Sequence, residues 1–339
     1  MKSTHIELAH GNGGILSRQL IQEICVKHFG NSTLNLLMDS AVIDIRAGNI
    51  AFTTDSYVIR PVFFPGGNIG TLAVCGTVND LSVMGAVPIA LSCGFIIEEG
   101  FAISELDEIA LSMRAVADAV NVRIVTGDTK VVEKGSADGI FINTSGIGTL
   151  AADVFSVTNQ KIEPGDAVIV SGTLGDHAAA VMTARQDFPL KSSIKSDVAP
   201  LSALVRHVLA SCRPGEVKIM RDPTRGGLAT TLNEFTPGTG CSCVLNEKHL
   251  PVHEEVRAIC EITGFDPLYL ANEGKVVIIA ASDSAGKIVQ LLHEHDLGKN
   301  AAVIGYFEKD ENEKVYLKTD VGGTRICDML VSDMLPRIC

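Results

Sequence analysis

The sequence predicts a mixed α/β (α+β) protein of two domains followed by a short tail. The chain has 339 residues, which is enough for two well-filled cores. Each half alternates short apolar segments with segments whose apolar residues recur every three or four positions, as in strands and helices. A Pro–Gly turn at 164–165 opens the second series. The predicted domains are therefore residues 1–155 and 156–320, and the Gly-rich, aperiodic segment 321–339 is the predicted flexible tail.

The first domain is predicted to contain three helices and five strands. Apolar residues of the first helix fall on one face, and the third helix starts at the capping sequence from Ser104 to Asp107. Residues 73–97 are apolar enough to cross a membrane, but polar and turn residues between 79 and 88 interrupt them, so a buried helix and strand are expected. Helices are expected near 15–29, 70–84 and 104–120, and strands near 34–39, 49–55, 87–97, 122–128 and 139–150.

The second domain is predicted to continue in the same manner. Pro200 and Pro251 stand where the first turn of a helix accepts proline. Strands are expected near 167–172, 275–281 and 302–308, and helices near 176–185, 200–211, 251–262 and 284–295.

Composition and charge exclude several classes of function. The net charge is −12 and the chain has no Trp, which argues against nucleic acid and anionic membranes as partners. The amino-terminal residues contain no apolar signal core. The nine cysteines form no recognisable framework, and the Cys241-x-Cys243 pair lacks a second pair at zinc-ligand spacing. Free thiols in this number are typical of a reducing compartment, so a cytoplasmic protein is expected.

Four aspartates share a similar context. Asp39, Asp55 and Asp128 stand at the ends of apolar strand-like segments, and Asp80 follows an apolar helix. Each one alone is better explained as a turn or capping residue. Together, carboxylates placed in this way can converge at one edge of a sheet and hold Mg²⁺ against phosphate oxygens. The pattern therefore predicts a shared metal–phosphate site.

Two further segments have features of phosphate sites. The loop of Gly11, Asn12, Gly13 and Gly14 precedes a helix, so its backbone N–H groups can surround an anion, although a flexible turn explains it equally well. Its spacing is not that of a Walker loop. In the sequence Asp128-Thr129-Lys130, the lysine beside the carboxylates can pair with a γ-phosphate or be an exposed loop residue.

Two more residues are candidates for chemistry. Glu273 comes directly before a buried strand, where it is either a turn residue or an acid–base group. The sequence ends in Cys339, whose thiol at the end of a short tail suggests a swinging carrier arm. It is not a prenylation signal, because that signal needs the cysteine four residues from the end. The segment from Arg221 to Gly227 is dense in turn and charged residues, so Asp222 either caps a turn or approaches a ligand.

Several of these stretches, taken in order, closely resemble the HypE family of hydrogenase maturation factors. This family belongs to the superfamily of aminoimidazole ribonucleotide synthetase, selenophosphate synthetase and thiamine monophosphate kinase. The resemblance runs from the first residues to the last, and the final PRIC is what distinguishes the family within the superfamily. The matching stretches are HGNGG (10–14), LLMDSAVI (36–43), residues 52–88, TGDTKVV (126–132), DPTRGG (222–227), NEG (272–274) and PRIC (336–339).

The resemblance implies a fold and a site. The fold is that of aminoimidazole ribonucleotide synthetase, in which the amino-terminal domains of a homodimer form a shared β-barrel. ATP and Mg²⁺ would bind in a cleft near that barrel, and a loop would close over the phosphates. Residues that match the family motifs are Asp39, Asp55, Asp80 and Asp128 for metal and phosphate, Gly11, Gly13 and Gly14 for the loop, Lys130 for the lysine of the GD-x-K motif, and Cys339 for the modified cysteine.

The resemblance also implies a reaction. A carbamoyltransferase, HypF, would place a carbamoyl group on the Cys339 thiol. An ATP-dependent dehydration would convert it to a thiocyanate, and the cyano group would pass to iron on a HypC–HypD complex for the [NiFe] hydrogenase centre. Glu273 and Lys130 are both candidates for the proton acceptor.

Two other functions fit the same sequence. The first is a kinase or synthetase that phosphorylates a small molecule, which would not need Cys339. The second is a non-catalytic scaffold for other maturation factors, which would not need the carboxylates or Lys130.

Overall fold

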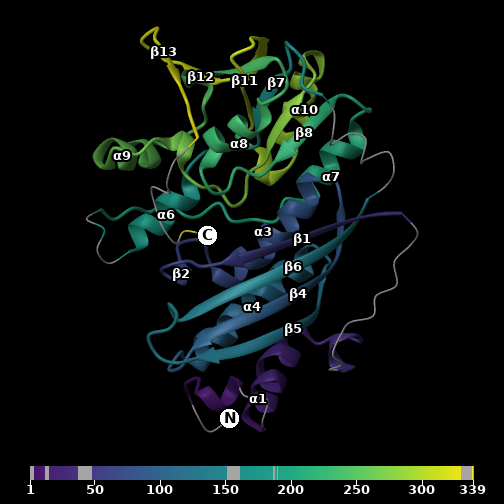
Figure 1. The fold of residues 1–339 in the computed structure, drawn as a ribbon, viewed down its shortest axis with the longest axis vertical. Helices are drawn as coiled ribbons and strands as arrows, with labels where there is room; N and C mark the ends of the chain where they lie inside the picture. The colour runs from purple at the N-terminus through teal and green to yellow at the C-terminus, as the bar shows by residue number, and fades with distance from the viewer. Residues whose placement is uncertain are drawn as a thin grey trace.

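The computed structural model contains two β-sheets, the first built from the first half of the chain and the second from the second half (Figure 1). It describes residues 4–11, 15–36, 48–150, 161–185, 188, 190–329 and 338. The predicted α/β (α+β) class is confirmed. Among the helices described, none combines the length and apolar character needed to cross a lipid bilayer.

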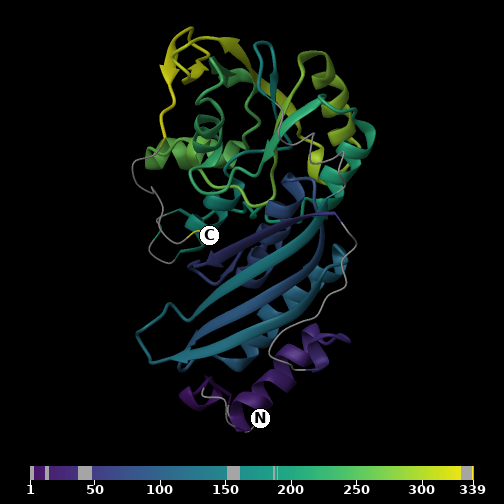
Figure 2. The same ribbon diagram turned by 45° about the vertical axis from the view of Figure 1, so that its right-hand side comes forward.

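The first sheet has four strands, and the helices of the described residues cover one of its two faces. Its order is β1–β6–β4–β5, antiparallel except for the parallel pair β4–β5. The helices α3 and α4 pack on one face (Figure 2). The other face carries exposed apolar side chains such as Phe52, which is 69% exposed. The bounds are β1 Asn49–Tyr57, α3 Ile69–Val83, β4 Val87–Glu98, α4 Ile103–Ala119, β5 Arg123–Val132 and β6 Ile140–Leu150.

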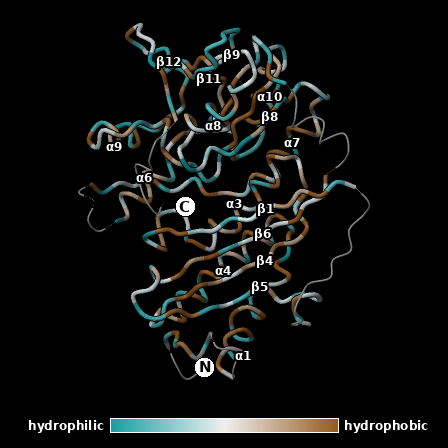
Figure 3. The backbone as a smooth tube through the Cα atoms, viewed as in Figure 1, coloured by the Kyte–Doolittle hydropathy of each residue, from teal (hydrophilic) through white to brown (hydrophobic). Residues whose placement is uncertain are grey.

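Helix α3 lies between the first sheet and the second half of the chain. Apolar residues occur on every side of this helix and nearly all of its residues are buried, as expected of a helix that is enclosed by other elements (Figure 3). The Asn68 side chain caps its first turn by accepting hydrogen bonds from Gly70 N and Thr71 N. Near its other end, Asn79 donates to Ala199 O and Glu273 O. The helix therefore fixes the two halves to each other.

The second sheet has seven strands in the order β13–β12–β9–β11–β7–β10–β8 and is antiparallel except for β9–β12. Because successive residues of a strand point to opposite faces, Val168 and Val170 of β7 pack toward α8, whereas Ala167 and Ile169 pack toward α7 and α10. The bounds are β7 Ala167–Val170, α7 Ser202–Ser211, β8 Val217–Arg221, α8 Gly227–Phe235, β9 Cys241–Asn246, β10 Val277–Ala280, α10 Ala285–His293, β11 Ala302–Lys309, β12 Val315–Lys318 and β13 Thr324–Ile326.

The remaining elements are short or lie at the edges. The amino-terminal helices lie beside β5, at the end of the first sheet farthest from the second (Figures 1 and 2). Two more helices, α6 and α9, lie beside the junction of the two halves. Their bounds are η1 Leu8–Gly11, α1 Ile15–Leu20, η2 Ile21–Val26, α2 Lys27–Phe29, η3 Leu34–Leu36, β2 Phe63–Phe64, β3 Gly67–Asn68, α6 Asp176–Ala184, η4 Glu247–His249, α9 Glu254–Thr263, η5 Pro267–Tyr269, η6 Ser282–Ser284 and η7 Asp296–Gly298.

Two expectations are corrected by the structure. In the strand expected at 34–39, Leu34–Leu36 instead form a 3-10 turn, which begins after the Asn31 side chain accepts from Thr33 N and Leu34 N, and residues 37–39 lie outside the described residues. Residues 324–327 do not belong to the tail expected from residue 321, because β13 pairs with β12 and Cys327 is fully buried in the core of the second half.

Candidate active site between the two halves

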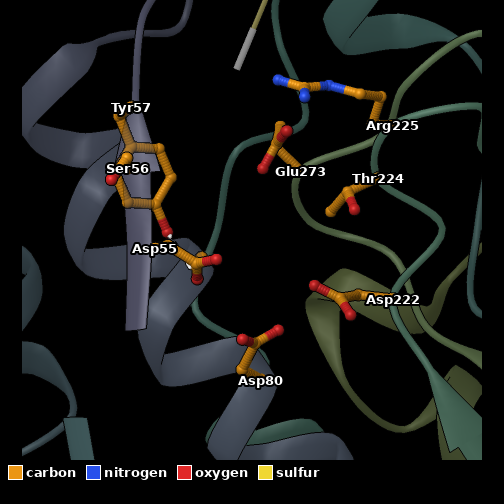
Figure 4. Close-up of a pocket in the computed structure, with 9 residues that line it drawn as sticks. Asp55, Ser56, Tyr57, Asp80, Asp222, Thr224, Arg225 and Glu273 are labelled. Atoms are coloured by element: carbon orange, nitrogen blue, oxygen red, sulfur yellow. Dashed lines mark hydrogen bonds between the residues drawn. The ribbon is translucent and has the colours of Figure 1, made fainter. Parts of the chain in front are cut away.

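A pocket of about 240 Å³ opens between the two halves of the molecule (Figure 4). Both walls carry carboxylates that point toward the centre, so four acidic groups face one another across a small volume. The first half contributes Asp55, Ser56, Tyr57, Gly76 and Asp80, and the second half contributes Asp222, Thr224, Arg225 and Glu273.

The acidic wall of the first half is built by β1 and α3. Every second residue of β1, at positions 53, 55 and 57, points to the helical face of the sheet, so Asp55 and Tyr57 face α3. The Tyr57 hydroxyl donates to Asp55 Oδ2 at 3.2 Å, and Thr53 Oγ1 donates to Asp80 Oδ2 at 2.6 Å. Each carboxylate of this wall is thus oriented by a hydroxyl group from β1.

Gly76 allows this arrangement. A Cβ atom on this residue would lie 2.1 Å from the Tyr57 hydroxyl oxygen, which is far below van der Waals contact. Because glycine leaves this space on α3 open, Tyr57 can reach Asp55 from the buried side of the sheet.

The opposite wall is built around the sequence Asn-Glu-Gly-Lys from 272 to 275. Glu273 is 3% exposed, and its backbone N–H donates to Asp197 Oδ1 at 3.1 Å. Lys275 pairs with the other oxygen of that buried carboxylate at 2.9 Å. A Cβ atom on Gly274 would lie 1.9 Å from Asp197 O, so only glycine allows this close approach. The backbone that carries the Glu273 side chain is therefore tightly held.

The grouping of like charges changes the acidity of these groups. Burial, followed by the charge of Asp80, raises the pKa of Asp55 to about 6. Burial, followed by the charges of Asp80 and Asp55, raises the pKa of Asp222 to about 7. The pKa of Glu273 is raised well above its ordinary value by burial and then by Asp222 and Asp197, against the opposing effect of Arg225. The carboxylates of the pocket therefore outnumber the positively charged groups that line it.

These features fit a cation that arrives with a phosphate group. In the part of the chain that the structure describes, no three His, Cys, Asp or Glu side chains form a ready metal site. Mg²⁺, however, commonly binds through one or two carboxylates, water and substrate phosphates. Glu273 Oε1 is buried and has no hydrogen-bond partner among the described residues, as expected of a group that receives its partner from a ligand.

The structure brings together some of the residues predicted from the sequence and separates others. Asp55, Asp80 and Glu273 line the pocket. Asp128 and Lys130 pair with each other on β5 and are 68% and 62% exposed. Across the sheet, Asp128 pairs with Gly94, Gly94 with Asn143, and Asn143 with Ser56. Asp128 therefore shares the uncovered face with Ser56, three strands from β1, whereas Asp55 points to the helical face.

The expected convergence of Asp128 with Asp55 and Asp80 therefore does not occur within one chain. Three strand spacings amount to roughly 14 Å, and the sheet itself lies between the side chains. Thr129 belongs to the same strand, and its backbone N–H donates to the Asp128 carboxylate. Gly11 ends the short helix η1. Asn12, Gly13, Gly14, Asp39 and Cys339 lie outside the described residues.

Sequence reasoning missed Tyr57, Gly76 and Arg225, and it left Asp222 open between a turn cap and a ligand contact. Tyr57 and Gly76 belong to apolar stretches, and no local pattern distinguishes them from core residues. Asp222 and Arg225 lie in a segment whose turns and charges stand out in the sequence, but those features alone do not assign it a role in the site. The signal that could have found them is a Pro and two Gly among charged residues, since such a loop exposes both backbone and charge to a ligand.

Comparison with known proteins gives one consistent relationship. The profile of AIR synthase related protein, N-terminal domain, matches residues 37–150, and that of the C-terminal domain matches 163–318. The carbamoyl dehydratase HypE of Rhizobium leguminosarum bv. viciae is 47% identical to this chain, covering 98% of this chain and 95% of that protein. These matches confirm the predicted two-domain aminoimidazole ribonucleotide synthetase-like fold.

Solved structures agree with the sequence matches. A crystal structure of hydrogenase maturation protein HypE in complex with ATP has a TM-score of 0.92 at 43% identity, and covers 98% of this chain and 99% of that one. A crystal structure of a HypE–HypF complex has a TM-score of 0.79 at 46% identity, with 92% and 99% covered.

Proposed function

Because the chain belongs to the HypE family of carbamoyl dehydratases, we propose that it is an ATP-dependent dehydratase acting on its own carboxyl-terminal cysteine. It converts the S-carbamoyl group of Cys339 to a thiocyanate, which supplies the cyanide ligand of the iron in [NiFe] hydrogenase. The observation that carries the self-directed reaction is the position of Ile338. This penultimate residue forms a β-bridge with Ile59, two residues beyond Tyr57 of the acidic pocket.

The chemistry follows from the poor leaving ability of an amide oxygen. The carbonyl oxygen of the thiocarbamate attacks the γ-phosphate of ATP, and one N–H proton is lost. The C–O bond then breaks with inorganic phosphate as the leaving group, the second N–H proton is lost, and the C–N bond becomes triple. Thiocarbamate and ATP thus give thiocyanate, ADP and phosphate, with the oxygen of the lost water carried away on phosphate.

Glu273 is the proton acceptor in this proposal. It lines the pocket, it is held by its backbone, and its raised pKa makes its carboxylate a stronger base than an ordinary glutamate. Lys130 is the other candidate, but in one chain it lies on the far face of the sheet and is paired with Asp128. The geometry within one chain therefore supports Glu273.

Asp55 and Asp80 would hold Mg²⁺ together with the phosphates, and Asp39 is a further proposed ligand. The ion would neutralise negative charge on the phosphate oxygens. Without ligand, burial and then the charge of Asp80 raise the pKa of Asp55, so a cation at this position would relieve the repulsion between the two carboxylates. The loop of Gly11, Asn12, Gly13 and Gly14 is proposed to close over the phosphates.

A homodimer would give Asp128, Thr129 and Lys130 a role. Asp128 and Lys130 lie on the uncovered face of the first sheet, which also carries the exposed apolar residues Ile50, Phe52, Val87 and Ile96, and Thr129 lies between them on the same strand with its side chain on the other face. An apolar sheet face of this kind is typical of an interface. A second copy packed there would complete the barrel implied by the family and bring these three residues to the nucleotide of its partner.

The proposed partners follow from the same reaction. HypF supplies the carbamoyl group, which the HypE–HypF complex of a relative supports. A HypC–HypD complex receives the cyano group. We place the reaction in the cytoplasm, and the eight free cysteines of the described chain support a reducing environment.

The decisive experiment is the mass of the carboxyl-terminal peptide. Cleavage before Asp333 releases residues 333–339, which contain one cysteine. In carbamoylated protein, Mg-ATP should reduce the mass of this peptide by one water, and Cys339→Ala should show neither modification nor loss. An unchanged carbamoyl mass during ATP consumption would refute the proposal and point to a diffusible phosphate acceptor.

A further inference from the structure

The carboxyl-terminal segment is held inside the fold by a histidine that the mechanism above does not use. Ile338 is 7% exposed and forms an antiparallel bridge with Ile59 at the junction of the two halves, where Figures 1 and 2 mark the chain end. Its carbonyl oxygen lies 2.6 Å from Nε2 of His177, near the start of α6. The bridge and this hydrogen bond hold the same residue from two elements of different halves.

The His177 ring is itself held by contacts at both nitrogens and by a neighbouring aromatic ring. It is fully buried, and it packs edge-on against the Phe64 ring with centroids 5.4 Å apart. Its Nδ1 lies 2.8 Å from the Ser196 hydroxyl. Burial lowers the pKa of His177, so the ring is neutral near pH 7 and carries a single N–H.

The hydrogen-bond partners determine which nitrogen carries that proton. A peptide carbonyl can only accept, so Nε2 must be the donor toward Ile338. Nδ1 is then an acceptor, and the Ser196 hydroxyl donates to it. The same hydroxyl oxygen accepts from Val198 N at 3.1 Å, which leaves its proton free for the ring. The network is therefore arranged to present one N–H to the tail.

The network leads directly to the proposed base. Ser196 is followed by Asp197, whose carboxylate accepts from Glu273 N and pairs with Lys275. One dipeptide therefore orients both the histidine that holds the tail and the backbone that carries Glu273. Ile338, whose carbonyl oxygen contacts His177, is joined directly to Cys339, and the Cα atoms of adjacent residues are about 3.8 Å apart.

We propose that His177 is a positioning residue that docks the carboxyl-terminal cysteine by donating a hydrogen bond to the peptide carbonyl before it. This inference rests on the proposed function for its purpose, because dehydration needs the carbamoyl group held at the pocket and HypF needs it released. A neutral hydrogen bond at a buried site suits such a reversible contact, since it contributes modestly and breaks without leaving a charge uncovered. The antiparallel bridge to Ile59 sets the direction in which the carboxyl-terminal segment runs, and the hydrogen bond to His177 sets how far the segment enters the junction of the two halves.

The first test measures docking without any turnover. Unmodified protein is treated with iodoacetamide in short pulses, and alkylation of Cys339 is followed in the peptide 333–339 by mass spectrometry. His177→Leu should increase this alkylation rate about fivefold, the effect of losing one such hydrogen bond. His177→Gln retains a side-chain N–H donor and should restore most of the protection.

The chain offers a matched control. His293 also lies within hydrogen-bond distance of a backbone carbonyl, with Nε2 2.9 Å from Ala301 O, but it is at the end of α10 and away from the pocket. His293→Leu should leave alkylation of Cys339 at the wild-type rate. Ser196→Ala, which leaves the ring intact, should increase alkylation in the same direction as His177→Leu, and so tests the network even if the leucine variant folds poorly.

The second test measures the reaction. Each variant is carbamoylated with cyanate, and the loss of water after Mg-ATP is followed in a single turnover. His177→Leu should slow dehydration by a similar factor, while His177→Gln and His293→Leu stay near the wild-type rate. Unchanged alkylation in both His177→Leu and Ser196→Ala would overturn the inference. If wild-type protein shows no dehydration, the proposed function fails, and the alkylation series still decides whether His177 docks the tail.

Discussion

At the scale of single residues, Glu273 combines burial, a raised pKa and an oxygen without a hydrogen-bond partner among the described residues. We expect Glu273→Gln to slow dehydration by at least about 100-fold, the usual range for loss of a general base. Folding stability should not fall, because glutamine removes a group that is costly to ionise in this site. Single-turnover mass spectrometry and thermal unfolding measure the two effects.

Lys130→Met is the variant to compare with Glu273→Gln. If Lys130 were the proton acceptor, its loss would abolish the pH dependence of dehydration, whereas Glu273→Gln would leave that dependence in place. Retention of the pH profile in Lys130→Met, together with its disappearance in Glu273→Gln, is the result expected here.

The carboxylates also make stability depend on pH. Asp222 has a pKa raised to about 7, so the folded protein binds a proton there more tightly than the unfolded chain does. The stability that protonation gives is complete below the ordinary pKa of about 4 and is lost as pH rises through 7. We expect Asp222→Asn to raise the Tm of the ligand-free protein by several degrees at pH 7.5 and by little at pH 4.5. A uniform shift at both pH values would contradict this.

At the scale of elements, the packing of α3 against β1 depends on Gly76. We expect Gly76→Ala to push the Tyr57 hydroxyl away from Asp55, to reduce dehydration at least about tenfold and to lower the Tm, because the added Cβ would stand 2.1 Å from that oxygen. Gly286→Ala is the matched control, since a Cβ on this helical glycine would have no neighbouring atom of the described residues within 4 Å. It should be neutral or slightly stabilising, as alanine is the better helix former.

The elements differ in how well the sequence predicts them. Periodic segments such as α4 and β4 are predicted near their true bounds, because their patterns are local. The strands β8, β9 and β12 are not predicted as strands, because they are short and their pairing is decided by neighbours distant in the chain. The edge strand β13 resembles tail in the sequence, since Thr324 and Arg325 are exposed and carry no strand-like alternation.

The candidate site shows the same division. Asp55, Asp80 and Glu273 could be predicted, because acidic residues at the ends of apolar segments are a local signal. The separation of Asp128 from them could not, since the face that a strand residue occupies depends on the register β5–β4–β6–β1 across the whole sheet. Family resemblance supplied the reaction, which residue patterns alone left open.

At the scale of the whole molecule, a homodimer would place Asp80 and Asp128 of each site on different chains. Neither Asp80→Asn nor Asp128→Asn alone should then dehydrate the carbamoyl group. Mixed dimers of the two variants should each contain one intact site, and an equal mixture should recover about a quarter of the wild-type rate. The rate of the mixture after co-refolding tests this, and Phe52→Asp, which should separate the copies, is the control. A mixture as inactive as its components would contradict shared sites.

The side chain of Asn79 limits how the two halves can move. It donates to Ala199 O and Glu273 O and accepts from Leu201 N, so a hinge opening between the halves would break three hydrogen bonds at once. The walls of the pocket are thus expected to behave as one rigid body. In hydrogen–deuterium exchange, the Leu201 amide should be among the most slowly exchanging amides, both with and without ATP. Substrate exchange would then depend on release of the Ile338 bridge from Ile59, a local event, and not on closure of one domain over the other.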